Sequence, residues 1–201
     1  EENPGVAYGQ VLEIDLDQLE PHVVGPHSPD RARPISELGE EARREGWPLE
    51  ISAALIGSCT NSSYEDMDRA AAVADQATEK GIRARTQFLV TPGSTQVFRT
   101  VQRDGQAASF EELGGTVLAN ACGPCIGQWH REGMEDGASN SIVSSFNRNF
   151  PGRNDGNAET LSFIASPEIV TAFAIAGRLD FNPLIDPIES ENGEASLLAV
   201  P

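Results

Sequence analysis

From residue 49 onward, short apolar runs alternate with amphipathic segments, and this alternation most constrains the fold. ISAALIG is a continuous apolar run typical of a strand that is buried on both faces. Similar patterns predict strands over 51–57, 86–90, 115–120 and 141–146, and helices over 64–79, 94–104, 126–132 and 168–176. Repeated strand and helix units of this kind predict an α/β fold: a three-layer α/β/α arrangement around a mostly parallel sheet.

The two ends of the chain have a different character. Prolines interrupt every candidate helix in residues 1–48 except one over 35–45, so this part is predicted to be an extended arm. Within it VLEIDLDQL, residues 11–19, alternates apolar and acidic residues as an edge strand does. We therefore expect one domain with an arm over 1–48, a core over 49–181 and an extended acidic tail over 182–201. The first residue is not methionine, and we interpret the chain as a fragment of a larger multidomain protein.

The charge balance excludes one class of partner. The chain has 31 acidic and 14 basic residues and a net charge of −17, whereas binding to nucleic acid requires a basic stripe. No apolar run approaches the roughly 18 residues that cross a bilayer. No basic start followed by an apolar stretch is visible either, so no targeting segment is predicted.

Three cysteines are placed where parallel sheets bind ligands. Cys59 follows the first predicted core strand, whereas Cys122 and Cys125 follow the third. Because ligands gather beyond the carboxyl ends of parallel strands, we expect the three thiols to meet there. Thiolates are suited to iron–sulfur clusters and to zinc, and Gly123 and Pro124 fit a tight turn that presents two sulfurs to one centre.

The residues alone leave other interpretations of these cysteines open. A disulfide between Cys122 and Cys125 would give Cys59 no role. A zinc site could take His130 as its fourth ligand. Any single cysteine could also be a buried structural residue.

The loop after the fourth predicted strand carries two arginines. Arg148 and Arg153 lie five residues apart in FNRNFPGRND, and each guanidinium can bind a carboxylate through two hydrogen bonds. The alternative is that they pair with neighbouring acids such as Asp155. Residues 61–63 have a sufficient structural role as a polar cap on the helix that begins at Tyr64.

The segments GSCTNSSYEDM, ANACGPCIGQW, SSFNRNFPGRND and SPEIVTAFAIAG resemble the aconitase family in order and spacing. The resemblance implies a 4Fe-4S cluster held by Cys59, Cys122 and Cys125, with one iron open to substrate as a Lewis acid. It also implies that Arg148 and Arg153 bind the tricarboxylate and that Asn147 lies near the cluster. The family's enzymes are hydro-lyases that convert citrate to isocitrate through cis-aconitate.

The family's general base and further substrate-binding groups have no match in these residues. The chain resembles only the third, cluster-bearing domain of an aconitase, so we expect it to be inactive by itself and to act with the remaining domains. Isolated preparations can hold empty, oxidised or zinc-loaded cysteines. The parent is expected in the mitochondrial matrix of a eukaryote or the cytoplasm of a bacterium. Alternatives are a homoaconitase, a methyl-aconitate hydratase, an isopropylmalate isomerase relative, or a zinc-binding structural module.

Overall fold

The computed structural model describes residues 8–57, 59–135, 137–190 and 192–199. The strands are β1 (His22–Val24), β2 (Ala32–Pro34), β3 (Ile51–Ile56), β4 (Gln87–Val90), β5 (Thr116–Val117), β6 (Asn140–Ser144), β7 (Thr160–Ile164), β8 (Ile188–Glu189) and β9 (Ala195–Ser196). The helices are α1 (Ile35–Glu45), α2 (Tyr64–Thr78), α3 (Thr95–Asp104), α4 (Gln106–Leu113) and α5 (Pro167–Ala176).

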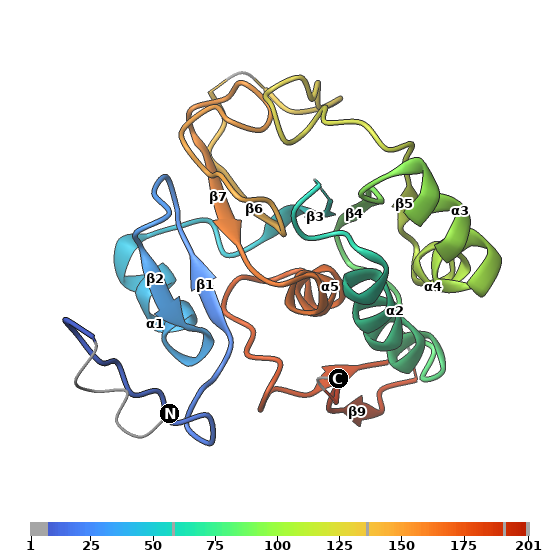
Figure 1. Ribbon diagram of the computed structural model, residues 1–201, viewed down its shortest axis with the longest axis horizontal. Coiled ribbons are helices and arrows are strands. Elements are labelled where there is room, and N and C mark those ends of the chain that lie inside the picture. Colours follow the sequence, from blue (N-terminus) through green and yellow to red (C-terminus); the bar gives the residue numbers. More distant parts are fainter. Residues whose placement is uncertain (1–7, 58, 136, 191, 200–201) are drawn as a thin grey trace.

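A seven-stranded sheet runs through the molecule in the order β2-β1-β7-β6-β3-β4-β5 (Figure 1). The five strands from β3 to β7 are parallel to their neighbours, and β1 adds to β7 in the antiparallel direction. The predicted α/β class and mostly parallel sheet are therefore confirmed. Residues 22–34, within the predicted arm, extend this sheet at one edge.

Local sequence signals explain where the helices begin and end. Ser63 caps α2 by accepting a hydrogen bond from the Asp66 amide, and the Asp66 carboxylate bonds back to the Ser63 amide. Pro167 occupies the first turn of α5, where its missing amide hydrogen has no cost. The predicted cap on α2 and the predicted helices over 35–45, 64–79, 94–104 and 168–176 are confirmed within one or two residues.

The two faces of the sheet are covered differently. Buried residues of all five helices join one apolar cluster with one face of the sheet. Against the opposite face, formed by residues such as Leu55 and Ile142, lie Leu118, Cys125 and Trp129. These three belong to residues 118–135, here named the cysteine segment, which has no helix or strand. With residues 146–158, the arginine segment, it lies in the region coloured yellow to orange above β6 and β7 (Figure 1). The third layer is thus irregular chain, not helix.

The predicted helix over 126–132 is wrong for a local reason. A turn spans residues 123–127 and ends at Gly127, whose φ of +80° is left-handed. Glycine adopts this backbone conformation without the steric cost that a Cβ would impose. The chain therefore turns away where a helix would continue.

Other predicted elements also differ. Residues 11–19 form no strand, because the Asp15 carboxylate accepts the Asp17 amide and starts a turn. The predicted strand over 115–120 is only the two-residue β5, which pairs with the short β4. Neither α4 nor β7 was predicted from the sequence, although TLSFI in β7 has the composition of a strand.

Candidate functional site

The candidate site begins where the order of the strands reverses. From β3 the chain passes to β4 on one side of the sheet, whereas from β6 it passes to β7 on the other. Loops leaving the adjacent carboxyl ends of β3 and β6 therefore diverge, which is the usual place for a ligand in an open parallel sheet. Cys59 lies on the first loop and Asn147 and Arg148 lie on the second.

Hydrogen bonds hold the loop that carries Cys59 against the end of β6. A backbone bridge joins Gly57 to Asn61 across the loop. The buried Ser145 hydroxyl accepts a hydrogen bond from the Gly57 amide at 3.0 Å, and the Asn61 amide side chain donates to the Ser145 carbonyl at 2.8 Å. Cys59 is held on this short loop with its side chain exposed.

Cys122 and Cys125 lie on one tight turn, as their spacing predicts. The Cys125 amide donates to the Cys122 carbonyl at 3.0 Å, and the Ile126 amide donates to the same carbonyl at 3.1 Å. Cys122 is exposed, whereas Cys125 is half-buried against the second face of the sheet. This turn thus presents one accessible and one partly covered thiol.

Burial and the Arg153 guanidinium act on the pKa of the Cys125 thiol in opposite directions. Burial raises the pKa of the Cys125 thiol above its ordinary value, and the charge and hydrogen bond of Arg153 oppose that rise. Negative charge at Cys122, and to a smaller extent at Cys59, would raise this pKa further. All three cysteines are free thiols. Among the described residues, no three His, Cys, Asp or Glu side chains form a group that could hold one metal ion.

The arginines are not neutralised by the nearest acid in the sequence. Asp155 forms an ion pair with Arg131 at 3.4 Å and not with Arg148 or Arg153. The Arg153 Nε atom is buried and has no hydrogen-bond partner. Arg148 and Asn147 are exposed, and neither forms a side-chain hydrogen bond or ion pair with the rest of the described chain. Two guanidinium groups with unused hydrogen-bonding capacity thus lie on the arginine segment.

Residues that analysis of the sequence missed hold these segments together. The Asn154 side chain donates to the Pro124 carbonyl at 3.0 Å, which ties the arginine segment to the turn between Cys122 and Cys125. The Asn149 side chain donates to the carbonyls of Ser28 and Ser162. The density of Asn and Asp in NRNFPGRNDGN was the available signal, since such side chains commonly bond to backbone in irregular chain. His130, considered as a zinc ligand, is exposed.

Fold and site together define an α/β domain that presents three free thiols and two arginines on loops beside a parallel sheet. Residues 1–177 match the model of the Aconitase family (aconitate hydratase), and the chain belongs to that family. The family predicted from the cysteine and arginine motifs is therefore confirmed.

Two relatives are similar over nearly all of the chain. It is 56% identical over 197 residues to a probable mitochondrial aconitate hydratase of Caenorhabditis elegans, covering 98% of this chain and 25% of that protein. It is 55% identical over 194 residues to the mitochondrial aconitate hydratase of Saccharomyces cerevisiae, covering 96% and 25%. The chain thus spans about a quarter of the length of these relatives.

Among solved structures, the crystal structure of Thermococcus kodakaraensis aconitase X (holo-form) matches 71% of this chain and 30% of that chain, with 15% identity and a TM-score of 0.36. No helix among the described residues is long and apolar enough to span a membrane.

Proposed function

We propose that the chain is the cluster-binding domain of an aconitate hydratase, a hydro-lyase. Cys59, Cys122 and Cys125 would hold a 4Fe-4S cluster. What supports the proposal is that three free thiols lie on loops that follow β3 and β5, and that the carboxylate nearest to Arg153 in sequence, Asp155, is paired with Arg131 instead. When bound, the cluster would supply one iron without a protein thiolate as a Lewis acid.

The donor set fits such a cluster. Its members are soft thiolates, the ligands that hold iron–sulfur clusters in proteins. Three thiolates on a cubane bind three different irons, so they need not surround one ion. A zinc module would instead need four ligands around a single ion at about 2.0–2.3 Å.

The arginine segment would bind the substrate of this enzyme. Arg148 and Arg153 can each bind a carboxylate through two hydrogen bonds, and a tricarboxylate such as citrate offers three. Asn147, beside Arg148, would donate its amide to a sulfur of the cluster or of a ligating cysteine. The reaction proposed for the parent is dehydration of citrate to cis-aconitate and rehydration to isocitrate.

The remaining domains of the parent are the proposed partners. A base that removes the carbon-bound proton and the rest of the substrate clamp would come from them, so this chain alone should not turn over citrate. A patch suited to such contacts lies at residues 8–19, where six large apolar side chains are 56–77% exposed: Tyr8, Val11, Leu12, Ile14, Leu16 and Leu19. The parent would work in the mitochondrial matrix of a eukaryote or the cytoplasm of a bacterium.

Anaerobic reconstitution of the chain with iron and sulfide tests the proposal. We expect absorption at about 400 nm and about four irons and four sulfides per chain, with no conversion of citrate to isocitrate. Replacing any one of the three cysteines with serine should abolish this absorption. His130→Ala is the matched control, because a zinc site that used His130 would lose its metal whereas the cluster would not. Bound zinc without sulfide after reconstitution would overturn the assignment.

A further inference from the structure

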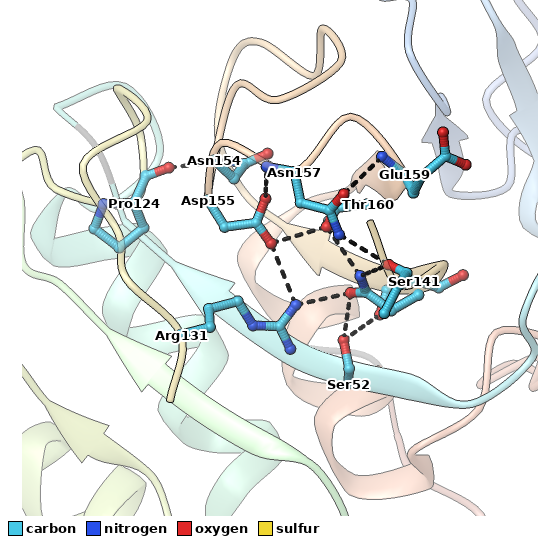
Figure 2. Close-up of polar contacts among 11 residues, drawn as sticks. Ser52, Pro124, Arg131, Ser141, Asn154, Asp155, Asn157, Glu159 and Thr160 are labelled. Carbon is cyan, nitrogen blue, oxygen red and sulfur yellow. Dashed lines mark hydrogen bonds and ion pairs between the residues drawn. The ribbon is translucent and has the colours of Figure 1, made fainter. Parts of the chain in front are cut away.

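A buried polar network joins the two irregular segments to the amino ends of the central strands (Figure 2). Arg131 comes from the cysteine segment, and Asp155 and Asn157 come from the arginine segment. Asn140 and Thr160 are the first residues of β6 and β7. The Asn140 side chain accepts from Arg131 at 2.7 Å and donates to the Thr160 hydroxyl at 2.9 Å. The Asn157 side chain donates to the Ala138 carbonyl at 2.8 Å.

The charged pair within this network is almost completely covered. The Arg131 side chain is 7% exposed and that of Asp155 is 4% exposed, with Nη1 and Oδ2 at 3.4 Å. Asp155 also accepts the Thr160 hydroxyl at 2.8 Å and the Asn157 amide at 3.1 Å. The Arg131 guanidinium lies 4.9 Å from the ring centroid of Trp129. A buried charge is costly without such partners, so each member depends on the other.

Whether the Asp155 carboxylate pairs with Arg131 or with Arg153 affects the proposed site. Asp155 lies two residues after Arg153 and one after Asn154, whose side chain holds the turn between Cys122 and Cys125. If the Asp155 carboxylate turned to Arg153, it would neutralise a guanidinium whose buried Nε atom has no hydrogen-bond partner. Arg131, which is 24 residues away in sequence, satisfies that carboxylate instead.

We propose that Arg131 and Asp155 are a positioning pair: they hold the arginine segment against the cysteine segment and keep the Asp155 carboxylate away from Arg153. Neither side chain contacts substrate in this role. The inference rests on the proposed function, because it assigns the Arg153 guanidinium to an anionic ligand. The pair thus has two proposed effects, which experiments can separate. It holds the two segments together, here called bracing, and it keeps the Asp155 carboxylate from Arg153, here called charge sequestration.

Hydrogen exchange on the cluster-free chain tests the bracing effect. Arg131→Gln should raise amide exchange in residues 121–129 and 147–154 by about tenfold or more, because local opening of these segments becomes easier. Arg103→Gln combined with Asp104→Asn is the matched control, since it removes an exposed ion pair on α3. Exchange in Arg131→Gln equal to that in the control would refute the brace.

Citrate binding to the reconstituted chain, measured by calorimetry, tests charge sequestration. Arg131→Gln should weaken binding by about tenfold, the loss expected when a charged hydrogen-bond partner is taken. Adding Asp155→Asn should restore binding to within about threefold of the wild type, because the competing charge is gone. No recovery in the double variant would overturn charge sequestration.

The two measurements separate this inference from the proposed function. A wild-type chain that binds no citrate after reconstitution would refute the proposed substrate site, while the exchange measurement would still decide the brace. Unchanged exchange with normal citrate binding would refute the brace alone.

Discussion

Ser145→Ala should destabilise the loop that carries Cys59, because Ser145 joins the ends of β3 and β6. Its side chain is fully buried, and its hydroxyl accepts from the Gly57 amide at 3.0 Å and donates to the Asn61 carbonyl at 3.2 Å. Alanine keeps the Asn61 bond to the Ser145 carbonyl but leaves the buried Gly57 amide without its partner. The variant therefore tests the contribution of the Ser145 hydroxyl alone.

The expected cost follows from that unpaired amide. An unsatisfied buried donor costs about 1–3 kcal/mol, so we expect the free energy of unfolding to fall by about 2 kcal/mol. For a chain of this size, that loss lowers the melting temperature by about 4–8 °C.

Urea unfolding followed by circular dichroism measures this cost, and the slope with denaturant should stay unchanged. Ser139→Ala is the matched control, because Ser139 is exposed and its loss should cost less than about 0.5 kcal/mol. Reconstitution should also give a lower cluster yield in Ser145→Ala than in the control. Equal stability of the two variants would refute the conclusion that the Ser145 hydroxyl stabilises the contact between the Cys59 loop and the end of β6.

Three further changes have predictable directions. Arg153→Gln should raise the pKa of Cys125 further, since burial would then be opposed less, and alkylation of that thiol at pH 8 should slow several-fold. Asp180→Asn should lower the free energy of unfolding at pH 7 but not in strong acid, because hydrogen bonds from Arg178 lower the pKa of Asp180 in the folded protein. The stabilisation by the ionised Asp180 is therefore present above its ordinary pKa of about 3.9 and is lost as the pH falls through the lower folded pKa. Ser63→Ala should reduce the free energy of unfolding by about 1 kcal/mol through loss of the α2 cap.

Each of these has a control in the same chain. Arg148→Gln should leave the alkylation profile of Cys125 unchanged, because Arg148 is not among the groups that shift its pKa. Ser166→Ala should cost much less than Ser63→Ala, because Ser166 precedes α5 without a side-chain capping bond. For Asp180, an advantage of the wild type that persisted unchanged to pH 2 would contradict the ion-pair explanation.

Much of the fold could be predicted from the sequence because it depends on local periodicity. The apolar run of β3, the cap before α2 and the proline at the start of α5 each act within a few residues. The spacing of Cys122 and Cys125 likewise set a turn whose hydrogen bonds are internal. These features determined the α/β class and the place of the thiols at the ends of strands.

The layer that covers the second face could be decided only by the tertiary structure. Nothing periodic marks the cysteine and arginine segments, whose positions depend on contacts such as Asn154 with the Pro124 carbonyl. The clearest case is Asp155, which could have paired with Arg153 two residues away but pairs with Arg131 across the fold. Proximity in sequence favours the first pair, whereas shared burial and the hydrogen bonds of β6 and β7 favour the second. The sequence by itself thus determined which groups the site contains, and the packing of distant segments decided which of them stay free to bind a ligand.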